Sequence, residues 1–136
     1  MFLVDSNVLL DIVKKDPRWG AWSEKALAQA VDTGPIAINQ LIYADVSVAY
    51  ERCEQLDSIL GAFDVAKLSL PWEAAFLAGK AFLKYRRRGG NKTSPLPDFY
   101  IGAHAMLAGL TLLTRDGRRY RGYFPELRLV CPDRES

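Results

Sequence analysis

MFLVDSNVLL, residues 1–10, places three apolar residues directly before an aspartate and then turns apolar again. The run Phe2–Val4 predicts a short buried strand, and Asn7–Val13 predicts a helix. Asp5 therefore follows a strand and precedes a helix. In an open parallel sheet, ligands bind beyond the carboxyl ends of the strands, so this position makes Asp5 a candidate site residue. The competing interpretation is that Asp5, or Ser6, only caps the helix.

Short apolar runs alternate with helical patterns along the rest of the sequence. The runs that predict strands are 2–4, 36–38, 65–70, 110–113 and 127–130, and the patterns that predict helices are 7–13, 22–31, 40–63, 72–85 and 98–107. Such alternation is typical of an α/β domain around a mostly parallel central sheet, with helices on both faces. Strands made of consecutive apolar residues, rather than alternating apolar and polar ones, agree with a sheet that is covered on both faces. We therefore predict a single domain over residues 1–136.

Composition and length limit the class of protein. The chain has 136 residues, of which 49% are hydrophobic and 25% charged, and its formal net charge is +2. These values are typical of a globular chain that is not a polycation, so any attraction to nucleic acid must be local. No apolar window is long enough to span a membrane, and Asp5 and Asp11 interrupt any signal peptide. Because Cys53 and Cys131 are far apart in the sequence, we expect two inert thiols in a soluble, cytoplasmic protein.

Three further aspartates occupy positions comparable to that of Asp5. Asp116 follows the apolar run of LTLLTRD, whereas Asp98 in SPLPDFYIG and Asp45 in INQLIYADVS lie near predicted helix starts. Residues at such positions can meet at one edge of a parallel sheet. Converging carboxylates repel one another, and a hard cation with oxygen ligands, such as Mg²⁺, relieves that repulsion. The pattern therefore predicts a cation site built from four acids.

Each of these acids also has a purely structural interpretation. Asp98 suits the positive end of a helix dipole, and Asp116 suits a turn. Asp45 is a poor residue for a helix interior and fits a solvated helix face. The single histidine, His104, lies six residues after Asp98 and so points away from that acid's side of the helix. We interpret His104 as a packing or surface residue.

Four segments resemble the signature blocks of PIN-domain ribonucleases, in the same order: LVDSNVLLDI, NQLIYADVS, LPDFYIGAHA and LTLLTRD. The resemblance covers nearly the whole chain and is nearest to VapC-type toxins of toxin–antitoxin pairs. It implies that Asp5, Asp98 and Asp116 bind the metal. It also implies that Asp45 occupies the second acidic position, where the family usually has the longer Glu. The residues that it implies as hydrogen-bonding supports of the acids are Ser6, Asn7, Asn39 and Thr114.

The resemblance implies hydrolysis of RNA phosphodiesters by an activated water, with Mg²⁺ or Mn²⁺ as cofactor. The products would carry a 5′-phosphate and a 3′-hydroxyl. The implied partners are an RNA substrate, a cognate antitoxin and a second copy of the chain in a homodimer. The shorter Asp45 keeps open a second hypothesis, a PIN module with weakened or lost nuclease activity that binds RNA or protein. A third, an unrelated α/β phosphoryl-transfer domain, is disfavoured because the sequence lacks a glycine-rich phosphate loop.

Two basic clusters are candidates for contacts with RNA at the rim of such a site. They are Arg86, Arg87, Arg88 and Lys92, and Arg115, Arg118, Arg119 and Arg121. The first cluster ends a predicted helix, where cations also stabilise the helix dipole and bind terminal carbonyls. The second interleaves with Tyr120 and Tyr123, which suits stacking on unpaired bases; a solvated loop is the alternative.

Overall fold

All neighbouring strands of the central sheet are parallel. The computed structural model describes residues 1–93 and 95–132, and within them the strand order is β3-β2-β1-β4-β5. The strands are β1 (Phe2–Val4), β2 (Ile36–Ile38), β3 (Ala66–Lys67), β4 (Thr111–Leu113) and β5 (Leu129–Val130). The predicted α/β class is confirmed, and the sheet is wholly rather than mostly parallel.

The helices connect these strands and cover them. They are α1 (Ser6–Val13), α2 (Gly20–Thr33), α3 (Gln40–Ser47), α4 (Cys53–Ala62), α5 (Trp72–Arg87), α6 (Pro97–Ala108) and α7 (Arg118–Tyr123). Pro97 at the first position starts α6, and Gly109 ends it in the left-handed conformation at φ 68°. None of the helices in the described residues is long and apolar enough to cross a membrane.

The single helix predicted over residues 40–63 is wrong, because α3 and α4 are separate helices. Arg52 has the extended backbone conformation φ −131°, ψ 145°. Oε1 of Gln55 accepts hydrogen bonds from the backbone N–H groups of Glu51 and Arg52, at 3.1 and 3.0 Å. This contact caps a new helix, and the spacing of apolar residues does not reveal it.

The third strand is shorter than predicted. Of the predicted strand 65–70, only Ala66–Lys67 forms a strand, although the backbone N–H of Leu68 still donates to the carbonyl of Ile38 in β2 at 2.8 Å. The backbone N–H of Leu70 donates instead to Oε1 of Gln40, at 2.9 Å. A side chain from the start of α3 therefore ends the strand.

The short helix α7 occupies residues for which the sequence allowed a solvated loop. It packs on α6 through Tyr120 and the following Phe124, which are 1% and 5% exposed. Gly102 of α6 faces both rings: a Cβ atom there would lie 2.6 Å from the Phe124 ring and 3.1 Å from the Tyr120 ring. Glycine at this position therefore allows α7 to approach α6 closely, and that approach fixes the position of Tyr120.

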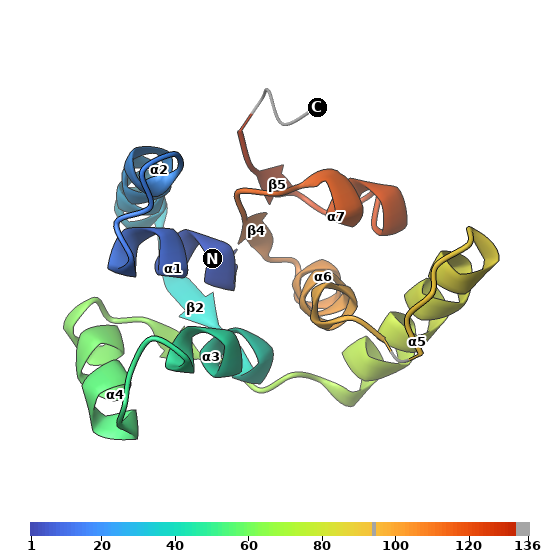
Figure 1. Cartoon of the computed structure of the whole chain (residues 1–136), viewed down its shortest axis with the longest axis horizontal. Helices are drawn as coiled ribbons and strands as arrows, with labels where there is room; N and C mark the ends of the chain where they lie inside the picture. The colour runs from blue at the N-terminus through green and yellow to red at the C-terminus, as the bar shows by residue number, and fades with distance from the viewer. Residues whose placement is uncertain (94, 133–136) are drawn as a thin grey trace.

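The sheet separates two hydrophobic cores. Leu3 and Leu112 belong to the larger core with α3, α5 and α6, whereas Val4 and Leu113 belong to the smaller core with α2. Figure 1 shows α2 on one side of the strands and α3 and α6 on the other, with α5 outside α6. Successive strand residues point to opposite faces, so two covered faces explain why the strands are apolar throughout.

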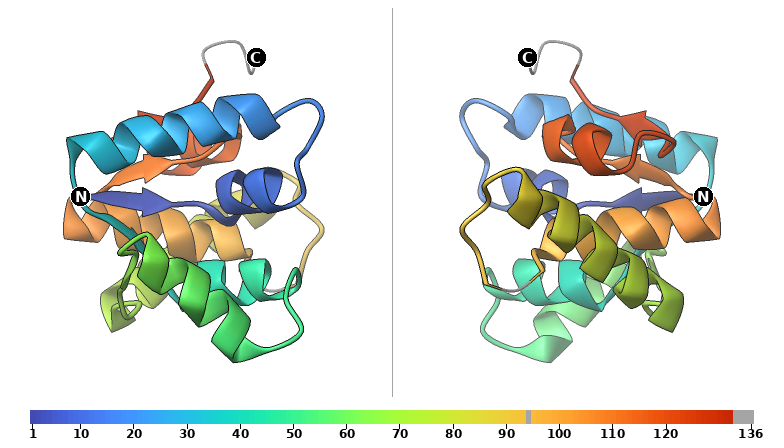
Figure 2. Two further views of the ribbon diagram at one scale, coloured as in Figure 1. Left: turned by 90° about the vertical axis from the view of Figure 1, so that its left-hand side faces the viewer. Right: turned by 90° about the vertical axis from the view of Figure 1, so that its right-hand side faces the viewer.

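The carboxyl ends of β1 and β4 lie side by side. The backbone N–H of Asp5 donates to the carbonyl of Leu113 at 2.8 Å, and that of Thr114 donates to the carbonyl of Val130 at 3.0 Å. Figure 2 shows α1 beginning directly beyond the end of β1. This edge of the sheet therefore collects the residues that follow each strand, among them Asp5.

Candidate functional site

Asp5 is a buried carboxylate at the carboxyl end of β1, with 4% of its surface exposed. Its Oδ1 accepts a hydrogen bond from the backbone N–H of Ser6 at 2.8 Å, so Asp5 does cap α1. Its Oδ2 accepts from the hydroxyls of Thr114 and Tyr120, at 2.9 and 2.8 Å. Burial and, to a smaller extent, repulsion from Asp98 raise the pKa of Asp5 from 3.8 to about 6, although these hydrogen bonds oppose the rise. No cation among the described residues pairs with it.

Tyr120 joins two of the acids, a role that the sequence did not reveal. Its hydroxyl oxygen lies 2.8 Å from Oδ2 of Asp5 and 3.3 Å from Oδ1 of Asp98. The ring is too buried to stack on an unpaired base, so that expectation is wrong for Tyr120. Burial and the two carboxylates raise the pKa of Tyr120 well above 10, so the hydroxyl keeps its proton. The signal that the sequence offered is the spacing of Tyr120 and Phe124, four residues apart, which lets both rings pack on the same neighbouring helix.

Asp98, Asp45 and Asp116 lie around the same edge. Burial raises the pKa of the Asp98 carboxyl; Arg119 and the Tyr120 hydroxyl oppose the rise, and repulsion by Asp116 and Asp45 adds to it. The backbone N–H of Asp116 donates to the Thr114 hydroxyl at 3.2 Å, and Oδ2 of Asp45 accepts from the Ser6 hydroxyl at 3.0 Å. Both acids therefore lie beside residues that contact Asp5. The structure thus brings the four aspartates that the sequence singled out to one edge of the sheet.

Neutral donors from the strand ends hold the acids. The Ser6 hydroxyl donates to Oδ2 of Asp45 at 3.0 Å. The Thr114 hydroxyl, which donates to Asp5, accepts from Nδ2 of Asn7 at 3.2 Å. Ser6 and Thr114 therefore contact acids directly, and Asn7 contacts one through Thr114.

Asn39 and His104 form a buried pair within the larger core. Oδ1 of Asn39 accepts from the backbone N–H of Ile42 at 3.1 Å and caps α3, while its Nδ2 lies 3.0 Å from Nδ1 of His104. His104 is 2% exposed, and burial lowers its pKa. Asn39 therefore supports helix α3 rather than an acid, and His104 is a packing residue.

Arg115 forms an ion pair within the fold, and 32% of its side chain stays exposed. Its Nε and Nη2 donate to Oδ2 and Oδ1 of Asp11, at 2.9 and 3.2 Å. Asp11 is 4% exposed and also accepts from the hydroxyl of Ser23 at 2.8 Å. The guanidinium lies over the Trp19 ring, 5.8 Å from its centroid. The contact of Arg115 with RNA stays a prediction; within the fold, this guanidinium ties α1 to the segment after β4.

A groove of about 370 Å³ lies next to the acids. Its lining residues are Tyr85, Asp116, Arg118, Arg119, Gly122 and Tyr123. Nε of Arg119 is 4.0 Å from Oδ2 of Asp98, so the groove borders the acidic edge. Cations, aromatic rings and an acid therefore share one surface formed by α7 and the end of α5.

The arginines at the end of α5 make local contacts. Nη1 of Arg86 donates to the carbonyl of Lys92 at 2.7 Å. Nη1 of Arg88 donates to the carbonyl of Gly122 at 3.2 Å, and its guanidinium lies 4.6 Å from the Tyr123 ring centroid. Arg87 is exposed in the last turn. Arg88 thereby connects α5 to α7, next to the groove.

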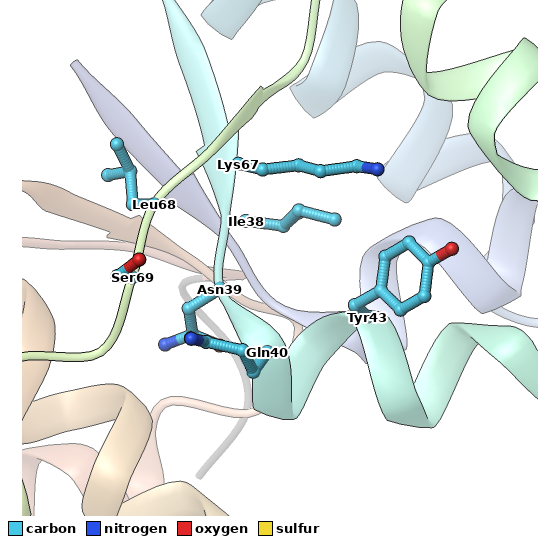
Figure 3. Close-up of a pocket in the computed structure, with 7 residues that line it drawn as sticks. All are labelled: Ile38, Asn39, Gln40, Tyr43, Lys67, Leu68 and Ser69. Carbon is cyan, nitrogen blue, oxygen red and sulfur yellow. The ribbon is translucent and has the colours of Figure 1, made fainter.

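A second cavity, of about 280 Å³, is separate from the acids. Its lining residues are Ile38, Asn39, Gln40, Tyr43, Lys67, Leu68 and Ser69. Figure 3 shows Ile38, Tyr43 and Lys67 extending to one side of the strands and Leu68 to the other. The Tyr43 hydroxyl donates to Oδ1 of Asp57 at 2.9 Å, and Nζ of Lys67 lies 2.8 Å from the same oxygen. Tyr43 and Lys67 beside this cavity therefore already have a partner in Asp57.

The donor set at the acidic edge fits a hard divalent cation. Mg²⁺ takes oxygen ligands and usually one or two carboxylates, with water completing its shell. In the part of the chain that the structure describes, no group of three or more His, Cys, Asp or Glu is already arranged to hold an ion. The raised pKa values of Asp5 and Asp98 indicate negative charge that a cation would stabilise. The residues present thus fit an open site rather than a closed protein cage.

Comparison with known proteins identifies relatives by sequence pattern and by fold. A family model described as the PIN domain matches residues 2–125. A comparison with curated proteins returned no match.

Several solved structures share the fold. VapBC2 from Rickettsia felis, bound to a DNA fragment from its promoter, is 19% identical, with a TM-score of 0.72 over 97% of this chain and 98% of that chain. DNA-bound VapBC from Salmonella typhimurium is 18% identical, with a TM-score of 0.69 over 96% of each chain. A toxin–antitoxin complex from Klebsiella pneumoniae is 23% identical, with a TM-score of 0.64 over 96% of each chain. At these identities the likeness shows the fold.

Proposed function

Because this chain belongs to the PIN domain family, we propose that it is a Mg²⁺-dependent endoribonuclease and the toxin of a toxin–antitoxin pair. The observation that carries the proposal is the state of Asp5: a buried carboxylate, next to a second acid, that only neutral groups stabilise. Structural acids that are buried normally have a cationic partner. A group whose environment is this unfavourable to its charge is a functional-site candidate.

The chemistry follows from the four acids and their supports. Asp5, Asp98 and Asp116 would hold the ion, and Asp45 would complete the site or orient the attacking water. When bound, Mg²⁺ or Mn²⁺ supplies a water of lowered pKa and positive charge beside the phosphate. Attack of water on phosphorus would leave a 5′-phosphate and a 3′-hydroxyl. Ser6 and Thr114 would keep the carboxylates of Asp45 and Asp5 in place through the hydrogen bonds described above.

The groove beside Asp116 is the proposed path of the RNA. Arg118 and Arg119 supply cations for phosphates, and Tyr85 and Tyr123 supply rings for unpaired bases. Arg86, Arg87 and Arg88 lie at the α5 end of the same region and would extend the basic rim. Single-stranded RNA suits this surface because its bases are free to stack.

An antitoxin is the proposed protein partner. The support is that the similar structures include toxin–antitoxin complexes, as the Klebsiella pneumoniae structure is described. An RNA substrate and two thiols outside any disulfide agree with a cytoplasmic location.

A second copy of the chain is the other proposed partner, and the outer face of α5 supports it. Trp72, Phe76 and Leu83 lie along one stripe of this helix and are 92%, 66% and 45% exposed, whereas its buried alanines face α6. Two copies of α5 packed antiparallel would cover both stripes. That packing would also place Glu73 of the first turn near Arg87 of the last turn of the other copy. Phe76→Glu should then convert a dimer into a monomer in light scattering, and a wild-type monomer would contradict this interface.

The alternative function is a PIN module with weak or no nuclease activity that binds RNA or protein. The observation that favours it is Asp45, which is one methylene shorter than the Glu that the resemblance implies and is held by Ser6. Binding of RNA without cleavage would distinguish this alternative.

The test is cleavage of an end-labelled single-stranded RNA by the purified protein. Cleavage with Mg²⁺ should stop on addition of EDTA and return with excess Mg²⁺ or Mn²⁺. Asp5→Asn should reduce the rate by about a thousandfold, because roughly 4 kcal/mol of transition-state stabilisation would be lost. Asp57→Asn, which changes an exposed aspartate outside the acidic edge, is the matched control and should cleave normally.

Three results would decide between the functions. Cleavage that survives in Asp5→Asn would contradict the assigned site. Cleavage in EDTA would contradict the metal requirement. Tight RNA binding with no cleavage under any ion would favour the binding module.

A further inference from the structure

We propose that Tyr120 is a positioning residue of the acidic site: its hydroxyl holds Asp5 and Asp98 at the separation that a divalent cation requires. The proposal rests on the metal-dependent function given above and assigns a role to a residue that the acidic pattern does not contain. The contacts that carry it are the hydroxyl's distances of 2.8 Å to Oδ2 of Asp5 and 3.3 Å to Oδ1 of Asp98.

The hydrogen bonds of Asp5 define which of its oxygens remains open. A carboxylate has about two acceptor positions on each oxygen. Oδ2 of Asp5 accepts from both Thr114 and Tyr120, so its positions are filled. Oδ1 accepts from Ser6 and has one position left. Tyr120 thus orients the carboxylate so that Oδ1 is the oxygen available to a cation.

Asp98 is held from two sides. Oδ1 faces the Tyr120 hydroxyl, and Oδ2 lies 4.0 Å from Nε of Arg119. Without the hydroxyl, the remaining attraction would come from Arg119, which would draw Asp98 toward the groove. Repulsion between Asp98 and Asp5 would act in the same direction. The hydroxyl therefore opposes both forces that separate the two acids.

The rest of Tyr120 is fixed independently of the acids. The side chain is 1% exposed, and its backbone carbonyl accepts from the N–H of Phe124 at 2.7 Å. Gly102 of α6 gives its ring room to approach. Because packing sets the ring, Tyr120→Phe should remove one oxygen atom and leave the surrounding fold in place.

The experiment measures Mn²⁺ and Mg²⁺ binding by isothermal titration calorimetry, without RNA, on wild type, Tyr120→Phe and Tyr43→Phe. Tyr43 is a matched control because its hydroxyl also donates to an aspartate, Asp57, outside the acidic edge. Tyr120→Phe should weaken Mn²⁺ binding about tenfold, the usual effect of losing a group that orients a metal ligand. Tyr43→Phe should bind Mn²⁺ like the wild type. Circular dichroism establishes that each variant is folded.

A purely structural role would lower the melting temperature of Tyr120→Phe and leave its Mn²⁺ affinity unchanged, and that result would overturn the proposal. If Tyr120→Phe does not fold, the test instead follows the ¹³Cζ NMR resonance of Tyr120 in the wild-type protein during a titration with Mg²⁺. A shift of this resonance that saturates with Mg²⁺ supports the proposal, and an unmoved resonance overturns it.

Failure of the proposed function gives a different pattern. Wild type that neither binds Mn²⁺ nor cleaves RNA would refute the metal-dependent nuclease and the role of Tyr120 together. Wild type that binds Mn²⁺ and cleaves RNA, alongside an equally competent Tyr120→Phe, would refute the role of Tyr120 alone.

Discussion

Asp5 and Asp11 lie six positions apart in the sequence and are buried to the same extent, each 4% exposed, yet their surroundings differ in kind. Asp11 has a cation: both of its oxygens accept from the guanidinium of Arg115, and Ser23 adds a third hydrogen bond. Asp5 has only neutral donors and faces a second acid, Asp98. The charge of Asp11 is thus neutralised by a cation, whereas the charge of Asp5 is not.

This difference separates a structural acid from a candidate functional one. A buried ion pair with good geometry satisfies its own charge and has no need of a ligand. A buried carboxylate without a cation destabilises the folded state unless it is protonated or binds an ion. Burial of an acid, taken alone, therefore says little about function; the charge of its partners carries the information.

The largest expected effect comes from removing the cation that pairs with Asp11. Arg115→Met should lower the free energy of unfolding by roughly 3 to 4 kcal/mol, because it leaves Asp11 buried without a cation. Urea denaturation measures the change. The double variant Arg115→Met/Asp11→Leu should recover much of the loss, since it removes the stranded charge as well. If Arg115→Met is as stable as the wild type, Asp11 is not compensated by this pair.

The next largest effect is a pH dependence of stability that comes from Asp5, which has no cationic partner among the described residues. Between pH 4 and pH 6 the folded protein binds more protons than the unfolded chain, because the pKa of Asp5 rises from 3.8 to about 6 on folding. The contribution of Asp5 to stability is therefore fully present below about pH 4 and is lost as the pH rises through 6. The loss amounts to about 2 to 3 kcal/mol.

Asp5→Asn should abolish this part of the pH dependence and make the protein more stable than the wild type at pH 7. Asp98, whose pKa is also raised, contributes in the same direction and remains in the variant. The measurement is the free energy of unfolding of both proteins from pH 4 to pH 7. If the free energies of unfolding of the two proteins change with pH in the same way, the surroundings of Asp5 do not disfavour its charge, and the prediction is wrong.

The smallest effect tests the neutral donors around the acids. Ser6→Ala removes the hydrogen bond to Oδ2 of Asp45 but keeps the backbone N–H that donates to Oδ1 of Asp5. One such bond contributes about 1 kcal/mol, so RNA cleavage should fall about fivefold. Ser47→Ala is the control, because the Ser47 hydroxyl bonds only within α3, to the carbonyl of Ala44. Unchanged cleavage in Ser6→Ala would remove Asp45 from the proposed chemistry.

Local pattern predicted the fold class, which the structure confirms, and it singled out the four acids, whose role stays a prediction; both depend on short-range features. An acid directly after an apolar run, as at Asp5 and Asp116, is visible in the sequence, and a parallel sheet brings such positions to one edge. The partners of those acids were not visible. Tyr120 contacts Asp5 across 115 residues, and Arg115 contacts Asp11 across 104. Such pairings depend on the packing of α7 against α6 and on the pairing of β1 with β4, which brings α1 beside the segment after β4.

The wrong prediction of one helix over 40–63 and the overlong strand 65–70 also come from side-chain contacts that the hydrophobic pattern does not show. The break between α3 and α4 depends on the Gln55 side chain reaching back to the backbone of Arg52, and the end of β3 depends on Gln40 reaching Leu70. Basic residues were also hard to assign, since Arg115 and Arg119 look alike in sequence. One is paired with a buried acid, and the other borders the groove.

The separation of 115 residues between Asp5 and Tyr120 also has a consequence for biosynthesis. A growing chain folds from its N-terminal part as it leaves the ribosome. Asp5 emerges early, but Tyr120 of α7, which holds it in place, is made 115 residues later. An unfinished polypeptide that lacks α7 therefore lacks the hydroxyl that holds Asp5 beside Asp98.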